Sequence, residues 1–177
     1  MSLREVLHLT HDVKKDDQLF DAHLCTALIS IIIQVSDICE DDIIPVEVLF
    51  RSYDEMPEIE KIALEKCTGR VLDVGAGAGV HALELMENGH DIVAIDVSEG
   101  AVSHMRSKGI DARMISFENL KHEKFDTILM LMNGIGIAGK LSNLSSFLKH
   151  AASLLNPGGK IICDSSDIKY LYMDDEG

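Results

Sequence analysis

Residues 70–96, RVLDVGAGAGVHALELMENGHDIVAID, contain the pattern that most strongly indicates the fold. Residues 70–74 form a short apolar run interrupted only by Asp73, which is typical of a buried strand. A glycine-rich turn follows, and residues 80–88 then have the length and apolar spacing of a helix that stops at a glycine. Residues 91–95 form a second apolar run. Strand, turn, helix and strand in this order predict a βαβ unit with a right-handed crossover.

The same alternation continues along the sequence. Further strands are expected at Ala112–Ile115, Thr127–Leu131 and Lys160–Asp164, with helices at Ser98–Lys108 and around Leu144–Leu155. Ser98 suits the N-cap of its helix, and Asn156-Pro157-Gly158-Gly159 is expected to end the later helix as a turn. Strands alternating with helices predict an α/β fold with a parallel sheet, whose ligand lies beyond the carboxyl ends of the strands.

The sequence before this region predicts helices. We expect residues 1–68 to form an N-terminal helical extension or lid that packs on a core of residues 69–177. Apolar residues recur at helical spacing from Leu19 to Val35. A second helical stretch is expected after Pro45, and a third from about Pro57 to Lys66.

The glycine spacing distinguishes between two classes of cofactor. The dinucleotide fingerprint requires glycine at the first, third and sixth positions, whereas Gly75, Gly77 and Gly79 occupy the first, third and fifth. Asp73 precedes the turn, where its charge would repel a pyrophosphate and attract a cation. Asp96 ends the second strand 21 residues after Gly75, where a carboxylate can accept hydrogen bonds from both ribose hydroxyls. The pattern therefore disfavours a nicotinamide oxidoreductase and favours adenosine joined to a cationic amino acid, which describes S-adenosylmethionine.

Three segments resemble motifs of the class I S-adenosylmethionine-dependent methyltransferases. They are VLDVGAGAGVHALELMENGHDIVAIDVSEGAV at 71–102, FDTILMLMNGIG at 125–136 and LLNPGGKIIC at 154–163. The resemblance covers roughly residues 69–165. It implies a Rossmann-like three-layer sandwich with a parallel sheet of order 3-2-1-4-5, S-adenosyl-L-methionine as the cofactor, and methyl transfer as the activity.

The resemblance also implies which residues bind the cofactor. Asp73 would lie near the amino group of the methionine moiety, Asp96 would hold the ribose, and Val97 would flank the adenine. Ser116-Phe117 would sit at the adenine edge, and Met132-Asn133 would face the transferred methyl group. The full set of implied cofactor residues is Asp73, Gly75, Ala76, Gly77, Gly79, Asp96, Val97, Ser116, Phe117, Met132 and Asn133.

Several of these residues also have an interpretation that involves no cofactor. Asp73 could be a capping residue, and Asp96 could cap the helix that follows it. Ser116 and Phe117 could be ordinary loop residues, and Asn133 could form a turn before the next glycine. The family often has Asp in place of Ser116, so a weaker bond to the adenine amino group is expected here.

The composition limits the partners. With 16 basic and 30 acidic residues, the formal charge of −14 predicts no nucleic acid and no membrane partner. No apolar run reaches the roughly 20 residues that span a bilayer, and the first residues lack the apolar region of a signal peptide. The cysteines, Cys25, Cys39, Cys67 and Cys163, lack a CxxC spacing. They are therefore expected to be free thiols in a cytoplasmic protein.

No metal site is predicted. His8, His11 and Asp12 have a suggestive spacing, but three residues near the terminus without a fourth ligand are more often exposed to solvent.

The acceptor is the least determined part of the prediction. Residues 132–135 lack the Asp/Asn-Pro-Pro-aromatic pattern of the amino-methylating DNA enzymes, and no Pro-Cys nucleophile is present. LMNGIGIAG at 131–139 resembles small-molecule methyltransferases instead. We expect the polar stretch Arg51–Pro57 over the cofactor crevice, with Tyr53 and His81 as candidate acceptor-side groups. No catalytic residue is identified, because transfer from a sulfonium needs alignment, and needs a base only when the acceptor is protonated.

Family members usually continue past the fifth strand into a helix and an antiparallel strand pair, for which residues 168–177 are too few. We therefore expect a truncated or domain-only sequence, whose fifth strand is an exposed edge that a homodimer or the tail could cover. Cofactor binding should survive, whereas the truncated chain could be inactive. The alternative function is a non-catalytic module or partner subunit that binds S-adenosylmethionine or S-adenosylhomocysteine.

Overall fold

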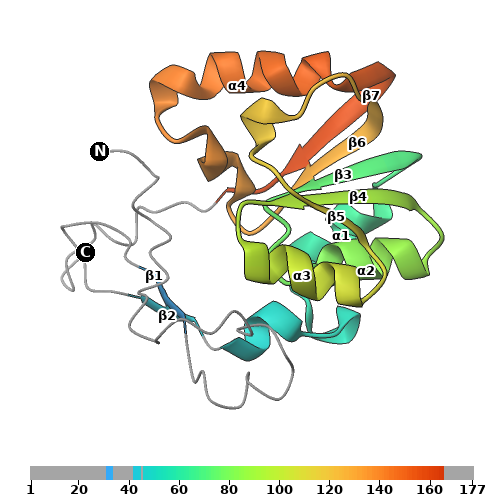
Figure 1. The fold of residues 1–177 in the computed structure, drawn as a ribbon, viewed down its shortest axis with the longest axis vertical. Coiled ribbons are helices and arrows are strands. Elements are labelled where there is room, and N and C mark those ends of the chain that lie inside the picture. The colour runs from blue at the N-terminus through green and yellow to red at the C-terminus, as the bar shows by residue number, and fades with distance from the viewer. Residues whose placement is uncertain (1–30, 34–41, 45, 166–177) are drawn as a thin grey trace.

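A five-stranded parallel sheet lies at the centre of the protein. The computed structural model describes residues 31–33, 42–44 and 46–165. The strands have the order β5-β4-β3-β6-β7 (Figure 1). Numbered along the sheet's own chain order, this is 3-2-1-4-5, so the predicted topology is confirmed. The order reverses between β3 and β6, which is where an open parallel sheet forms a ligand crevice.

The elements follow the predicted alternation. The strands are β3 (Arg70–Val74), β4 (Asp91–Asp96), β5 (Asp111–Met114), β6 (Phe125–Met130) and β7 (Leu155–Cys163). The helices are α1 (Glu58–Glu65), α2 (Val80–Glu87), α3 (Glu99–Ser107) and α4 (Leu141–Ser153). Short 3-10 turns are η2 (Val46–Phe50), η3 (Tyr53–Glu55), η4 (Phe117–Asn119) and η5 (Gly134–Ala138). The predicted N-cap of α3 is confirmed, because the Ala101 N–H donates to Ser98 Oγ at 3.3 Å.

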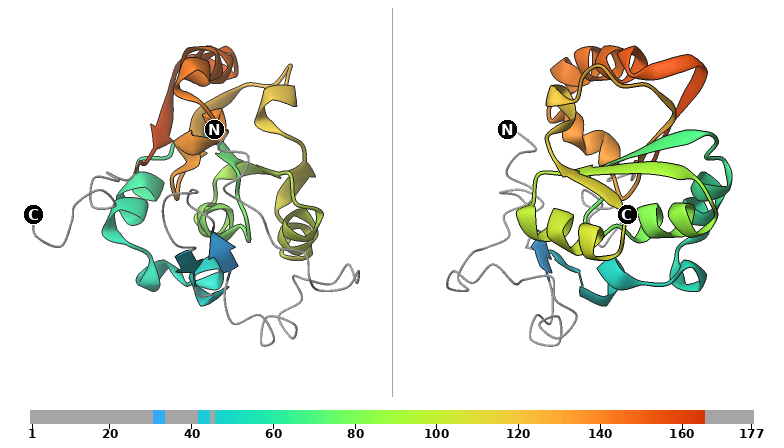
Figure 2. Two further views of the ribbon diagram at one scale, coloured as in Figure 1. Left: turned by 90° about the vertical axis from the view of Figure 1, so that its left-hand side faces the viewer. Right: turned by 45° about the vertical axis from the view of Figure 1, so that its right-hand side comes forward.

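Helices cover both faces of the sheet. α1, α2 and α3 lie on one face and α4 lies on the other (Figures 1 and 2). The core under α1–α3 includes Val71, Leu85, Ala94, Met105 and Leu129. The core under α4 includes Leu72, Val93, Ile128, Phe147 and Leu154. Successive strand residues face opposite sides, so Asp73 shares the α1–α3 side of β3 with Val71. These layers form the predicted three-layer sandwich.

The N-terminal part contains a strand pair where a helix was expected. Ile31–Ile33 (β1) pairs antiparallel with Asp42–Ile44 (β2), so the predicted helix reaching Val35 is wrong at residues 31–33. Three consecutive β-branched isoleucines favour a strand because their χ1 freedom is restricted in a helix. The rest of that predicted helix lies outside the described residues. After Pro45 the helical stretch is the 3-10 turn η2, whereas α1 lies within the predicted third helix.

β7 begins earlier than predicted. The sequence suggests that Asn156–Gly159 forms a turn, but the strand already starts at Leu155. Leu155 pairs with Phe125, whereas the next pair is Thr127 with Lys160, so extra residues bulge from β7. Proline and glycine are compatible with a bulge, because the extra residues need no ladder hydrogen bond. The predicted start of this strand at Lys160 is therefore wrong.

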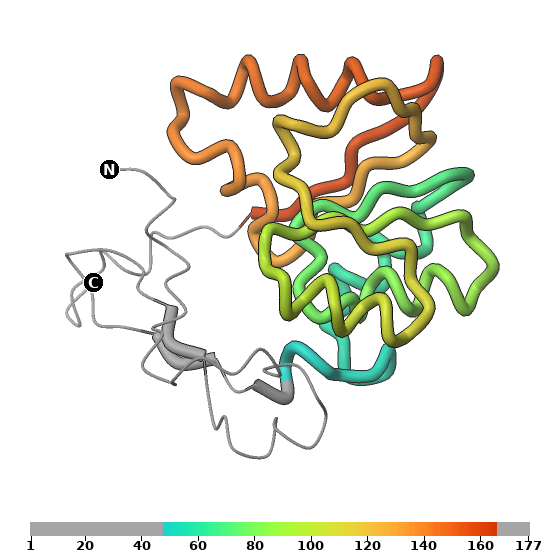
Figure 3. Tube along the Cα trace, viewed as in Figure 1, coloured from blue at the N-terminus to red at the C-terminus, as the bar shows by residue number. Residues whose placement is uncertain are grey.

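Other predictions bear on single residues and segments. Cys67 is a buried free thiol and Cys163 an exposed one, as predicted, whereas Cys25, Cys39, His8, His11 and Asp12 lie outside the described residues. Within the described segments no three His, Cys, Asp or Glu side chains group as a metal site. Figure 3 traces the course of these segments through the fold. None of their helices is long and apolar enough to cross a membrane.

We predict that Gly79→Ala destabilises the protein more than Gly89→Ala. Both glycines have left-handed backbone, with φ of +81° and +85°, so alanine adds strain of about 1 kcal/mol at each. A Cβ at Gly79 would also lie 2.6 Å from Cγ of Met105, whereas nothing lies within 4 Å at Gly89. The clash should add about 1 kcal/mol or more in urea unfolding. Equal losses for the two variants would contradict this close packing of the glycine turn on α3.

Candidate cofactor-binding site

The glycine turn lies at the carboxyl edge of the sheet. The N–H groups of Gly75 and Ala76 donate to the Ile95 carbonyl at 2.9 and 3.1 Å, which ties the turn to the end of β4. A Cβ at Gly75 would lie 2.9 Å from Cδ1 of Ile137, so η5 lies directly beside the turn. A side chain at position 75 would therefore clash with Ile137, so Gly75 contributes only its backbone where the segments after β3 and β6 meet.

All three glycines of the turn have a backbone that L side chains rarely adopt. Their φ angles are +71° at Gly75, +56° at Gly77 and +81° at Gly79. The first, third and fifth spacing identified in the sequence is thus a requirement of the turn's own geometry.

Asp96 holds this turn with its side chain. Its Oδ2 accepts from the Gly77 N–H at 2.9 Å, and its Oδ1 accepts from the Ser98 N–H at 2.8 Å. The cap of α3 itself is Ser98, so Asp96 does not act merely as a helix cap. It stays half-buried, and each oxygen keeps a lone pair that can accept from a ligand hydroxyl.

Asp73 is buried without a full set of partners. Its residue is 2% exposed, and Oδ2 has no hydrogen-bond partner among the residues that the structure describes. Burial raises the pKa of Asp73 to about 6, with the nearby charge of His81 opposing the rise and that of Asp96 adding to it. A buried, unpartnered carboxyl group at a ligand crevice fits a cationic group such as an ammonium.

The residues proposed to contact adenine differ in accessibility. Val97 is 73% exposed and free to flank a ring. Ser116 is half-buried, and its Oγ accepts from the Asn119 side-chain amide at 2.8 Å. Phe117 is buried and packs on Phe147, with ring centroids 4.9 Å apart. Phe117 is therefore a core residue, and only its backbone remains for a ligand.

Met132 and Asn133 follow β6 in strained backbone. Both are non-glycine residues at positive φ, +57° and +62°. Their N–H groups donate to the two carboxylate oxygens of Asp164 at 3.0 and 2.7 Å. Asn133 also precedes η5 as its N-cap residue, so the turn interpretation accounts for its backbone.

Asp164 is a site residue that the sequence analysis missed. It follows the end of β7, so the rule that identified Asp73 and Asp96, an acid at the carboxyl end of a parallel strand, would also have found it.

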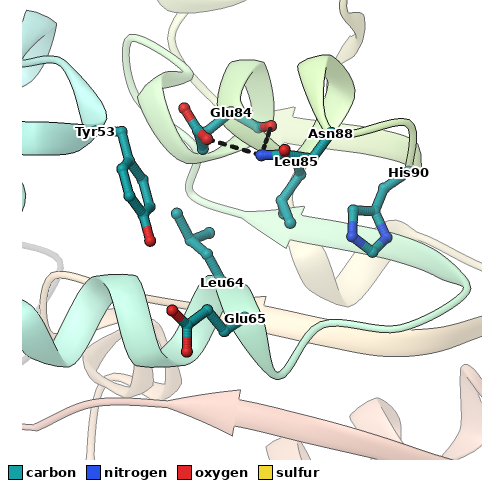
Figure 4. Close-up of a pocket in the computed structure, with 7 residues that line it drawn as sticks. All are labelled: Tyr53, Leu64, Glu65, Glu84, Leu85, Asn88 and His90. Carbon is teal, nitrogen blue, oxygen red and sulfur yellow. Dashed lines mark hydrogen bonds between the residues drawn. The ribbon is translucent and has the colours of Figure 1, made fainter.

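Tyr53 and His81 do not lie together beside the glycine turn. Tyr53 lines a pocket of about 300 Å³ with Leu64, Glu65, Glu84, Leu85, Asn88 and His90 (Figure 4). Asn88 and His90 lie at the opposite end of α2 from the turn, so Tyr53 is not placed as the predicted acceptor-side group. His81 is 5% exposed, and its Nε2 lies 2.8 Å from Glu60 Oε2.

Glu60 and Arg51 complete a buried ion cluster that sequence patterns did not indicate. Arg51 Nη2 donates to the same Glu60 oxygen, and the Arg51 and Glu60 side chains are each 7% exposed. Burial alone would raise the pKa of Glu60, but the hydrogen bonds from His81 and Arg51 lower it overall. Glu60 therefore stays ionised in the interior.

Comparison with known proteins identifies the relatives of this site. A family model described as "Methyltransferase domain" matches residues 71–159. The crystal structure of a SAM-dependent methyltransferase from Bacteroides fragilis in complex with S-adenosyl-L-homocysteine is 46% identical, with a TM-score of 0.74. That alignment covers 80% of this chain and 60% of the other.

Curated relatives match the same region at lower identity. A cypemycin N-terminal methyltransferase from Streptomyces sp is 30% identical over 102 residues, covering 55% of this chain and 42% of the relative. A ubiquinone biosynthesis O-methyltransferase from Azorhizobium caulinodans is 32% identical over 101 residues, covering 52% of this chain and 38% of the relative. The chain thus spans about two fifths of the length of these relatives.

We predict that Asp73→Asn becomes progressively more stable, relative to the natural protein, as the pH rises from 4 to 8. The folded-state pKa of Asp73, about 6, lies above the ordinary aspartate value of 3.8. The carboxyl group therefore favours the folded state while protonated, and this advantage is lost as the pH rises through 6. The relative change should be about 3 kcal/mol, measured by urea unfolding across this range. A flat Asp73→Asn profile would refute the raised pKa of this buried carboxyl group.

We also predict that Asp164→Ala loosens the segment after β6. Two charge-assisted hydrogen bonds to strained residues disappear, and partial exposure lets water replace them in part. The expected loss is therefore about 1–2 kcal/mol in urea unfolding. Asp164→Asn, which keeps one acceptor oxygen, should lose about half as much. Unchanged hydrogen exchange at Met132 and Asn133 in both variants would show that Asp164 does not hold them.

Proposed function

Because the chain belongs to the methyltransferase-domain family of class I S-adenosylmethionine-dependent methyltransferases, we propose that it binds S-adenosyl-L-methionine and transfers the methyl group to a small molecule. The observation that carries the proposal is the buried Asp73 carboxyl group at the switch point of the sheet, whose Oδ2 has no partner among the residues that the structure describes. An unpaired buried acid is costly, and the ammonium of the cofactor's amino-acid moiety would supply its missing partner.

The remaining contacts follow from the same edge of the sheet. The backbone of Gly75, Ala76 and Gly77 would border the amino-acid moiety, with Gly79 packed behind on α3. Asp96 would accept from the ribose hydroxyls with its free lone pairs. The adenine would lie between exposed Val97 and the backbone at Ser116-Phe117. Met132 and Asn133, fixed by Asp164, would border the methyl group.

Methyl transfer from a sulfonium requires little from the protein beyond alignment of the acceptor with the methyl group. The bound cofactor supplies a methyl group already activated by its sulfonium sulfur. The chain has to hold the acceptor in line with that carbon and keep water out, and such positioning is worth about 7–11 kcal/mol. The absence of a proposed catalytic base in this chain is therefore compatible with catalysis.

A small-molecule acceptor agrees with the acidic composition of the chain. The net charge of −14 opposes a polyanionic acceptor such as nucleic acid. The relatives are named as a cypemycin N-terminal methyltransferase and a ubiquinone biosynthesis O-methyltransferase. Because these names describe different acceptors, experiment has to identify the acceptor atom. We further propose that residues 1–68 form an N-terminal extension that packs on the core, that the protein forms a homodimer and that it lies in the cytoplasm.

The proposal is tested by titrating the protein with S-adenosylhomocysteine and with NADH in a calorimeter. We predict binding of the first and none of the second. Asp96→Asn should weaken S-adenosylhomocysteine at least tenfold, because a hydrogen bond to a charged group contributes about 1.5–3 kcal/mol. The matched variant Asp111→Asn, at the amino end of β5, should bind normally. Tighter binding of NADH would overturn the assignment.

Methyl transfer is tested separately from binding. Radiolabelled S-adenosylmethionine incubated with a panel of small metabolites should give labelled product. Binding without turnover on any acceptor would favour the non-catalytic module instead.

A further inference from the structure

The segment that follows β6 has a backbone conformation that its own residues do not favour. Met132 and Asn133 are adjacent and have φ of +57° and +62°. In the part of the chain that the structure describes, His122 is the only other non-glycine residue with positive φ. A side chain makes this left-handed region costly, and asparagine tolerates it better than methionine does. Such strain persists only where surrounding contacts hold it, and it is concentrated at functional sites.

Asp164 supplies those contacts from the neighbouring strand. Its two carboxylate oxygens accept from the N–H groups of Met132 at 3.0 Å and Asn133 at 2.7 Å. Its own N–H donates to the Met130 carbonyl at 3.3 Å. Successive N–H groups in a turn form a concave site for an anion, and here a carboxylate of the same chain occupies it. One residue thus ties the end of β7 to the strained turn after β6.

The strained turn lies at the crevice of the sheet. β3 and β6 are neighbouring parallel strands, and Asp73 pairs with Leu129 near their carboxyl ends. Further along the chain, a Cβ at Gly75 would lie 2.9 Å from Cδ1 of Ile137, so the segments after the two strands lie side by side. The strained turn falls between these two contacts in sequence and therefore borders the crevice on its β6 side. Met132 is 38% exposed there.

We propose that Asp164 is a positioning residue that holds Met132 and Asn133 in this conformation and so shapes the wall of the site facing the transferred methyl group. It thereby sets how well the site distinguishes S-adenosylmethionine, which carries this methyl group, from S-adenosylhomocysteine, which lacks it. The inference rests on the proposed function and adds to it a residue that acts through the turn rather than by contact with the cofactor.

The charge of Asp164 offers a second explanation for the same preference. A negative charge attracts a sulfonium, so it favours S-adenosylmethionine over its uncharged thioether product. The two explanations differ in what they require of the side chain. Positioning requires both oxygens at hydrogen-bond distance from the two N–H groups, whereas attraction requires only the charge. Asp164→Glu separates them, because it keeps the charge but moves the carboxylate by one methylene group.

The test measures the affinities of both ligands by calorimetry and compares their ratio. In Asp164→Ala, S-adenosylmethionine should lose about fourfold more affinity than S-adenosylhomocysteine, because contact with one methyl group contributes roughly this factor. Asp164→Glu should show a selective loss of about twofold or more for the same reason. A variant that merely unfolds more readily weakens both ligands by one factor and leaves the ratio unchanged. Asp164→Asn, which keeps one acceptor oxygen, gives the same comparison should the alanine variant not fold.

Asp126 provides a matched control at the opposite edge of the sheet. Its Oδ2 accepts from the Arg70 N–H at 2.8 Å, and its Oδ1 accepts from the Asn156 side-chain amide at 2.9 Å. Asp126→Ala therefore also removes two hydrogen bonds that join neighbouring strands, but near the amino ends of β3 and β6. It should lower stability while leaving the ratio of the two affinities unchanged.

The outcomes distinguish the inference from the function beneath it. If Asp164→Ala changes both affinities by the same factor, or changes neither, Asp164 is a structural residue and the inference is wrong while the proposed function stands. If Asp164→Ala shows the selective loss and Asp164→Glu does not, the charge sets the preference and the inference is again wrong. If the natural protein binds neither ligand, the proposed function fails, and the inference fails with it.

Discussion

The main constraint on the site is the free-energy cost of burying the Asp73 carboxyl group. It occupies the face of β3 that packs under α1 and α2, where its neighbour Val71 is part of an apolar core. An apolar side chain at position 73 would fit this environment at no electrostatic cost. The acid instead keeps an oxygen without a partner among the residues that the structure describes. The glycine turn follows Asp73 directly along the chain.

Three aspartates lie at or next to the carboxyl ends of parallel strands, and each makes different contacts. Asp73 is buried and incompletely paired. Asp96 accepts from two backbone N–H groups and fixes the glycine turn to the start of α3. Asp164 accepts from two N–H groups of the strained segment after β6. The carboxyl ends of parallel strands share one edge, so the three aspartates lie along the same edge of the sheet.

Local patterns predicted the central sheet well because each βα unit is built from neighbours in sequence. They failed where a local preference competed with a partner elsewhere. The isoleucines of β1 fitted a helical spacing, but they pair with β2. Asn156–Gly159 reads as a turn, but β6 keeps this run within β7 as a bulge. The packing of Phe117 on Phe147 in the core under α4 was likewise not indicated by local patterns.

Sequence patterns predicted the parallel sheet, the glycine spacing of the turn and the acids Asp73 and Asp96, since period, spacing and residue type encode those features over a few residues. Which groups these acids contact depends on the folded structure. Glu60 reaches His81 across 21 residues, and Asp164 reaches Met132 across 32. Such pairs depend on how helices pack on a sheet, and that packing depends on the shape of the whole core rather than on any short segment of chain.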